Sequence, residues 1–153
     1  MTRQEYGRST EQIELPGFLP HGQANYLYAD DDLFVVHAAG PFNREFVEYL
    51  IQIETGLLKE MSEKHARWYA LTTITNSAMM TPDAMIRYAE YRQAMRDSKL
   101  NPQAIAFVLG PEVEGRQLMF PHFAKLYGDS GITFAEFTEE APARDWLQTL
   151  RDA

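Results

Sequence analysis

The segment 67–95 constrains the fold most, because it changes from a strand-like pattern to a helical one. Residues 68–74 (WYALTTI) form a compact apolar and β-branched run of strand length, which suits a sheet better than a helix. Thr81 and Pro82 indicate a helix start, since threonine is a good N-cap and proline is tolerated at the first helical position. Asp83 would add a negative charge at the positive end of that helix. A strand, a loop and a helix are therefore predicted in this order.

Apolar patterns continue this alternation along the chain. The predicted helix has one apolar stripe at helical spacing, which we expect to pack on the sheet. The stripe consists of Ala84, Tyr88, Tyr91 and Met95. The next strand is predicted at 104–109 (AIAFVL), the most uniformly apolar run of the sequence. Continuous hydrophobicity indicates burial on both faces, as in a parallel strand inside an α/β sheet.

The remaining segments predict a fold class. Residues 24–29 and 33–39 are short strand-like runs around Asp30, Asp31 and Asp32, which indicates a β-hairpin with a solvated turn. The connections between the later strands exceed a dozen residues and are long enough for right-handed crossovers, so those four strands should be parallel and the first antiparallel. We predict an α/β fold with a single five-stranded mixed sheet, mostly parallel with crossover helices, in the order β-β-α-β-α-β-α-β-α. The predicted strands are 24–29, 33–39, 68–74, 104–109 and 132–137, and the helices begin near Asn43, Thr81, Pro111 and Thr138.

Two residues interrupt the predicted helices. Gly56 lies inside the first helix and marks either a close approach of another backbone or a break between two helices. Pro121 should kink or divide the third helix. Residues 1–23 contain several helix breakers and are predicted to be a lead-in segment, which either packs on the surface or acts as a swapped or regulatory arm. Residues 24–153 form the predicted domain.

Composition limits the classes of function. The net charge of −8 opposes nucleic-acid binding, because that binding depends on Lys and Arg. No apolar run is long enough for a membrane span, and no secretory signal is recognised, so a cytoplasmic location is expected. There is no cysteine, and the four histidines fall in four different elements without a second ligand nearby, so neither a metal nor a cofactor is expected. Without a nucleotide loop or a nucleophile motif, no catalytic residue is assigned and a non-enzymatic protein is predicted.

The order of elements and the segment EEAPARDWL at 139–147 resemble the STAS domain superfamily, particularly its SpoIIAA-like branch. The resemblance covers about residues 24–150 and implies a sheet of sequentially ordered parallel strands. It also implies a protein-interaction switch, in which a partner kinase phosphorylates a serine just after the third strand. Ser77, preceded by Asn76, is the nearest match, although the usual aspartate is absent and Ala78 follows where a Gly or Ser is usual. The SpoIIAA-like branch is also similar to lipid-carrier domains, which implies a ligand-binding alternative.

Methionines and tyrosines gather after the third strand, where open α/β sheets tend to bind ligands or partners. Exposed Met and Tyr side chains favour interfaces, and buried ones fill the core. We therefore predict binding of a protein partner, or self-association as a homodimer, through the loop 75–83. The predicted binding residues are Asn76, Ser77, Met79, Met80, Thr81 and Tyr88, and Ser77 is also the predicted phosphorylation site. The alternative is a carrier of a small apolar ligand between sheet and helices, lined by Trp68, Tyr88, Tyr91 and Phe123.

Overall fold

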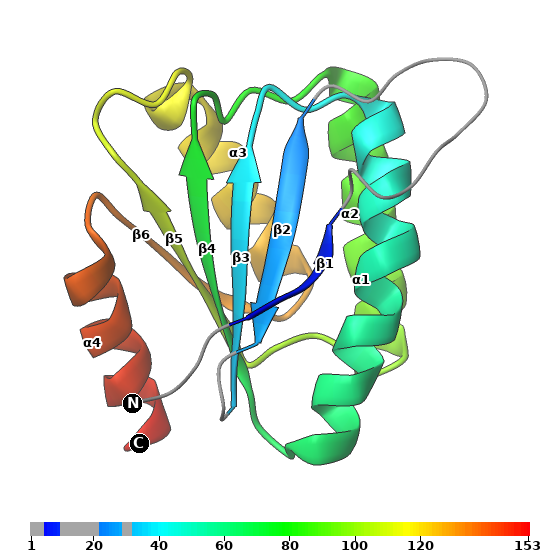
Figure 1. Ribbon diagram of the computed structural model, residues 1–153, viewed down its shortest axis with the longest axis vertical. Helices are drawn as coiled ribbons and strands as arrows, with labels where there is room; N and C mark the ends of the chain where they lie inside the picture. Colours follow the sequence, from blue (N-terminus) through cyan, green and yellow to red (C-terminus); the bar gives the residue numbers. More distant parts are fainter. Residues whose placement is uncertain (1–4, 10–21, 29–31) are drawn as a thin grey trace.

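The computed structural model describes residues 5–9, 22–28 and 32–153 of the chain. It shows an α/β fold with one mixed sheet and helices on both faces (Figure 1). The predicted alternation of strands and helices is confirmed. In chain order the elements are β1 (Glu5–Ser9), β2 (Gln23–Tyr28), β3 (Leu33–Ala39), α1 (Arg44–Lys64), β4 (Tyr69–Thr75), α2 (Pro82–Asp97), β5 (Ala104–Leu109), α3 (Arg116–Asp129), β6 (Thr133–Phe137) and α4 (Glu140–Arg151).

The strands lie side by side in their sequence order. β2 and β3 form the predicted antiparallel hairpin, and β3, β4, β5 and β6 are parallel to one another, as the long connections predicted. β1 adds a strand that the sequence did not predict, antiparallel to β2, inside the segment assigned to the lead-in. The aspartate turn and the rest of the lead-in fall mostly on residues 1–4, 10–21 and 29–31, outside the described residues.

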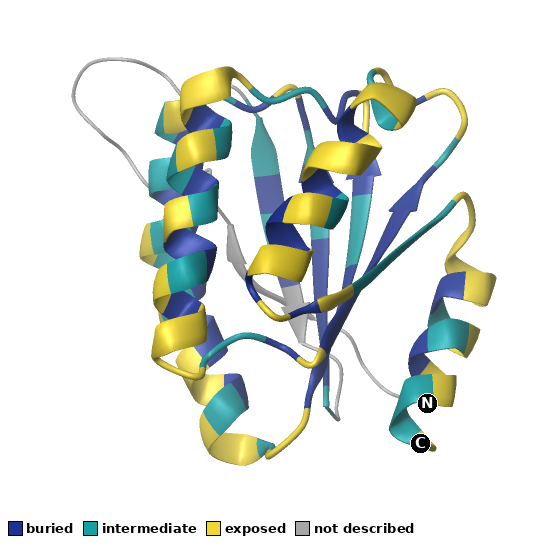
Figure 2. Cartoon of the chain, turned by 180° about the vertical axis from the view of Figure 1, so that it is seen from behind, coloured by how far each residue is buried: buried dark blue, intermediate teal, exposed yellow. Residues whose placement is uncertain are grey.

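The helices divide the core into two layers. A sequential order of parallel strands with right-handed crossovers places all connecting helices on one face, and α1, α2 and α3 lie there. α4 follows the last strand and covers part of the opposite face, against β4 and β5 (Figure 1). Figure 2 shows buried residues along the inner sides of the helices and through the central strands. All six residues of β5 are buried, which confirms the prediction of burial on both faces.

Local sequence signals explain where α1 and α2 begin. The Asn43 side chain caps α1 by accepting a hydrogen bond from the Phe46 amide at 2.9 Å. α2 begins at Pro82, as predicted, and its predicted stripe is buried. α4 has Glu139 at its N-cap, so the predicted cap at Thr138 is wrong by one residue. None of the described helices is long and apolar enough to cross a membrane.

The two predicted interruptions do not divide the helices. α1 runs through Gly56, where an added Cβ would meet no atom within 4 Å, so this glycine marks neither a break nor a close approach. α3 continues through Pro121, so of the two predicted effects, a kink or a division, the division does not occur. Proline removes one backbone donor, which leaves the carbonyl of Gln117 without its helical partner. Gln117 and Pro121 are both exposed, so water can donate a hydrogen bond to the Gln117 carbonyl.

Candidate ligand-binding site

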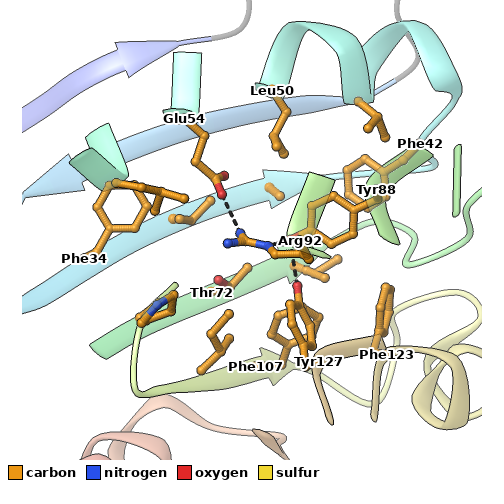
Figure 3. A pocket seen from close by; sticks show the side chains of 18 of the residues that line it. Phe34, Phe42, Leu50, Glu54, Thr72, Tyr88, Arg92, Phe107, Phe123 and Tyr127 are labelled. Atoms are coloured by element: carbon orange, nitrogen blue, oxygen red, sulfur yellow. Dashed lines mark hydrogen bonds and ion pairs between the residues drawn. The ribbon is translucent and has the colours of Figure 1, made fainter. Parts of the chain in front are cut away.

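A cavity of about 70 Å³ lies between the sheet and the three helices that cover it (Figure 3). Inner-face side chains of β3, β4 and β5 line it on one side, and side chains of α1, α2 and α3 line the other. Three of the four residues predicted for a carrier pocket are part of this lining, namely Trp68, Tyr88 and Phe123. The fourth, Tyr91, is buried next to the cavity but does not line it.

The cavity is mostly apolar because alternate residues of the strands face it. Val36, Ala70 and Phe107 represent the inner faces of the three central strands. Thr72 is the polar residue among these inner-face positions. It is half-buried although helices cover this face, and its hydroxyl has no hydrogen-bond partner among the described residues. Thr72 therefore offers a free hydroxyl inside an apolar surface.

A buried ion pair borders the cavity. Glu54 of α1 and Arg92 of α2 contact each other through Oε1 and Nη2, with side chains 3% and 5% exposed. Figure 3 shows the Arg92 guanidinium pointing into the pocket, with Glu54 on the helix above it. Charges are rarely buried unless they are paired and hydrogen-bonded, because removing them from water costs much free energy. This pair is therefore an unusual feature of an otherwise apolar layer.

Four tyrosines surround the Glu54–Arg92 pair and its hydrogen-bond partners. Tyr26 and Tyr91 each donate a hydrogen bond to the Glu54 carboxylate at 3.2 Å. Arg92 Nε donates to the Tyr88 hydroxyl at 3.1 Å, and that hydroxyl lies 2.9 Å from the hydroxyl of Tyr127 (Figure 3). Burial raises the pKa of each of these four tyrosines. They therefore remain protonated donors near neutral pH.

Asn101 fixes the position of Arg92 from the side of the α2–β5 loop. Its Oδ1 accepts from Arg92 Nη1 at 3.2 Å, and its Nδ2 donates to the backbone carbonyls of Arg92 at 3.1 Å and Ser130 at 3.3 Å. Burial acts against the charge of Arg92, but Tyr88, Glu54 and Tyr91 outweigh it and raise the pKa of Arg92 above its usual range. Arg92 is thus a fixed cation at the cavity wall.

The first two predicted binding residues lie in the loop above the cavity. Asn76 is exposed, has a φ of 66°, and its Nδ2 donates to the Gly40 carbonyl at 2.6 Å. Ser77 is 2% exposed, its hydroxyl donates to Glu114 at 2.8 Å, and it accepts from the Met79 amide at 3.2 Å. A phosphate on Ser77 would need the loop to open and would lie beside a carboxylate. This environment does not favour the phosphorylation that the family resemblance implies.

The other predicted residues divide between loop and cavity. Met79 and Met80 are half-buried and pack against the core, so neither presents the exposed side chain that an interface would need. Thr81 is exposed, and its amide donates to the Phe42 carbonyl at 3.1 Å. Met80 and Tyr88 line the cavity, whereas Asn76, Ser77, Met79 and Thr81 do not.

Sequence reasoning missed the polar residues at the cavity, namely Glu54, Arg92 and Thr72. The sequence does contain a signal for Glu54 and Arg92, because each of these charged residues falls on the apolar face of its helix. Glu54 lies four residues after Leu50 and four before Leu58, both buried, and Arg92 lies four after Tyr88. An acidic and a basic residue at buried positions of two consecutive helices indicate an internal ion pair.

A second hollow, of about 220 Å³, lies on the opposite face of the sheet. Asn25, His37 and Thr73 line it from neighbouring strands, in register with one another. These residues are half-buried, because α4 does not cover this part of the sheet. The hollow is a polar surface depression and lacks the buried groups of the cavity.

No family model, curated protein or solved structure matches this chain. The resemblance to STAS domains therefore stays a prediction from the order of elements and the segment 139–147.

Proposed function

We propose that the protein is a non-enzymatic binding module that holds a small apolar molecule in the cavity between the sheet and α1–α3. The cavity itself carries this proposal. Protein interiors are close-packed and contain few voids larger than a water molecule. A space of about 70 Å³, bordered by apolar side chains, one free hydroxyl and a fixed guanidinium, is a larger void than core packing explains. The cytoplasmic location of the protein stays a prediction.

The volume limits the size of the ligand. An apolar protein cavity of about 150 Å³ holds one benzene molecule. The 70 Å³ of this cavity therefore accommodate about three or four non-hydrogen atoms without rearrangement. Longer molecules require side chains to move, and Met80 at one end of the lining is the most adaptable of these.

Native mass spectrometry of freshly purified protein tests whether the module carries a ligand. We expect an adduct that disappears after denaturation and refolding, and a melting temperature that rises when a small apolar ligand is added, because a ligand that binds the folded state stabilises it. A clean apo mass together with unchanged melting in the presence of small apolar ligands would contradict the proposal.

Two neighbouring alanines of β3 provide a matched pair of variants. Ala38 faces the cavity, whereas the side chain of Ala39 points to the opposite face of the sheet, where it lines the polar hollow. Ala38→Leu adds three carbon atoms at the cavity and should abolish ligand-induced stabilisation, and Ala39→Leu should retain it. Equal ligand-induced stabilisation in the two variants would show that the ligand binds elsewhere.

We also propose, as a second candidate, self-association through the loop 75–83 and the start of α3. The observation that favours it is the exposure of Leu118, a large apolar side chain that is 62% exposed, in the helix that begins beside this loop. Leu118→Asp should convert a dimer to a monomer in sedimentation velocity. A wild-type protein that is monomeric at all concentrations, or a dimer that survives the substitution, would contradict this candidate.

A further inference from the structure

The polar groups around the cavity contain more hydrogen-bond donors than acceptors. A guanidinium carries five N–H groups and accepts no hydrogen bond. The described residues use one N–H of Nε, one of Nη1 and one of Nη2, with Tyr88, Asn101 and Glu54 as acceptors. One N–H on Nη1 and one on Nη2 of Arg92 therefore have no acceptor among these residues. The rings of Tyr88, Tyr91 and Tyr127 lie 5.1 to 6.0 Å from Arg92 Cζ and attract its charge, but they offer no oxygen for these two groups.

The tyrosines add a further donor without an acceptor. Tyr26 and Tyr91 use their hydroxyl protons on Glu54. Tyr88 and Tyr127 share one hydrogen bond between their oxygens, so the proton of only one of them lies in that bond. The other hydroxyl proton has no acceptor in the part of the chain that the structure describes. Arg92, Tyr88 and Tyr127 all line the cavity, so these spare donors border the space that a ligand would fill.

The charge at the cavity is balanced. Glu54 and Arg92 neutralise each other, and among the residues that the structure describes no other charged side chain lines the cavity. A bound anion would leave one negative charge in excess, close to the Glu54 carboxylate and away from water, where an unpaired charge is strongly disfavoured. A bound cation would add donors to a site that already has too many. Both charge signs are therefore unfavourable.

We infer that the occupant is a small neutral carbonyl compound whose oxygen accepts hydrogen bonds from Arg92 and from the Tyr88–Tyr127 pair while its carbon atoms fill the apolar part. This inference rests on the proposed function and specifies the ligand class. A ketone oxygen has two lone pairs, carries no charge and needs no acceptor in return. It accepts from two of the three spare donors and keeps the charge balance.

Three four-carbon probes near pH 7 test the charge preference: 2-butanone, butanoate and butylammonium. Each probe has one or two non-hydrogen atoms more than the cavity holds without rearrangement, so Met80 must move to admit it. Methyl NMR spectra provide the readout, because Ala70 and Met80 line the cavity whereas Ala106 of β5 and Ala143 of α4 are buried between the opposite face of the sheet and α4. We expect 2-butanone to shift the Ala70 and Met80 methyl signals with saturation and to leave the Ala106 and Ala143 signals unchanged. Its affinity should be at least tenfold higher than that of either charged probe.

A substitution that changes the charge balance should reverse the preference. Glu54→Gln leaves the Arg92 charge without a carboxylate, so butanoate should then bind at least tenfold tighter than 2-butanone. Glu48→Gln is the matched control, because Glu48 lies on the same helix but pairs with Arg87 at the surface, with side chains 38% and 29% exposed. The control should keep the preference of the wild-type protein for the ketone.

The outcomes separate the two proposals. If no probe shifts the cavity methyl signals, the proposed function itself is wrong. If butanoate or butylammonium binds the wild-type protein as tightly as 2-butanone does, the cavity binds ligands but the inference about their class is wrong. The wild-type comparison decides this inference by itself, so a Glu54→Gln variant that fails to fold leaves the result intact.

Discussion

Replacing Glu54 by leucine should destabilise the fold by much more than a change in side-chain volume would. The substitution removes the carboxylate that neutralises Arg92 and that accepts the hydroxyl protons of Tyr26 and Tyr91. Removing one partner of a buried ion pair costs about 3–5 kcal/mol, because the remaining charge is left unpaired away from water. Leucine fills similar space, so little of the loss comes from a cavity. We expect the free energy of unfolding to fall by about 4 kcal/mol.

The double variant Glu54→Leu/Arg92→Met should recover part of this loss. It removes both charges, and replacing a buried ion pair with apolar residues of similar volume is often nearly neutral. The hydroxyls of Tyr26 and Tyr91 and the side-chain oxygen of Asn101 would lack partners, each at a cost of about 1 kcal/mol. The double variant should therefore be more stable than Glu54→Leu by about 1–2 kcal/mol.

Urea unfolding at neutral pH, followed by circular dichroism, measures these free energies. Glu48→Leu provides a control, because exposed pairs such as Glu48–Arg87 contribute only about 0–1 kcal/mol. The single variant Arg92→Met completes the comparison. A double variant whose loss of stability equals the sum of the losses in Glu54→Leu and Arg92→Met would refute the reasoning, since it would show that the two charges act independently. A Glu54→Leu variant that is as stable as the control Glu48→Leu would also refute it.

Three other substitutions test the stability of the fold. Gly56→Ala should raise the free energy of unfolding by about 0.5–1 kcal/mol, because the site is helical and open. Gly115→Ala should lower it by more than about 1 kcal/mol, since the residue has a φ of 74° and a Cβ there would lie 2.4 Å from Met79 Sδ. Equal effects at both sites, measured by urea unfolding, would contradict this. Burial raises the pKa of the Glu136 carboxyl, although the nearby charge of Arg116 acts in the opposite direction. The folded state therefore keeps the carboxyl proton up to a higher pH than the unfolded state does. As a result, the free energy of unfolding falls as the pH rises through this pKa. Glu136→Gln should therefore stabilise the protein near pH 7 by less than about 1 kcal/mol, after solvent screening, and leave stability near pH 4 unchanged; a gain near pH 4 as large as the gain near pH 7 would contradict it.

The alternation of elements could be predicted because it depends on local patterns. The continuous apolar run of β5 and the stripe of α2 both identify buried surfaces from spacing alone. Asn43 and Pro82 mark helix starts through capping and backbone geometry, which involve few neighbouring residues. Pro121 does not divide α3, and the sequence could not decide this, because the outcome depends on whether water reaches the freed carbonyl, which follows from the tertiary position of α3.

The candidate site could be predicted only in part. Trp68, Tyr88 and Phe123 were expected to line a pocket because they are apolar residues facing one layer, and they do. Met79 was predicted to be a binding residue of the loop 75–83, but this loop folds against the core and half-buries the Met79 side chain. Its interactions depend on the Gly115 turn, which is distant in sequence.

The sequence by itself determined the order of strands and helices, the parallel arrangement and the sides of the helices that are buried, because these follow from periodicity and connection length. Only the tertiary structure decided that Glu54 meets Arg92, that four tyrosines surround them and that a cavity remains beside them. These contacts join residues of α1, α2, α3 and β2. Their distances depend on how the helices pack across the sheet, and no local pattern of residues encodes that packing.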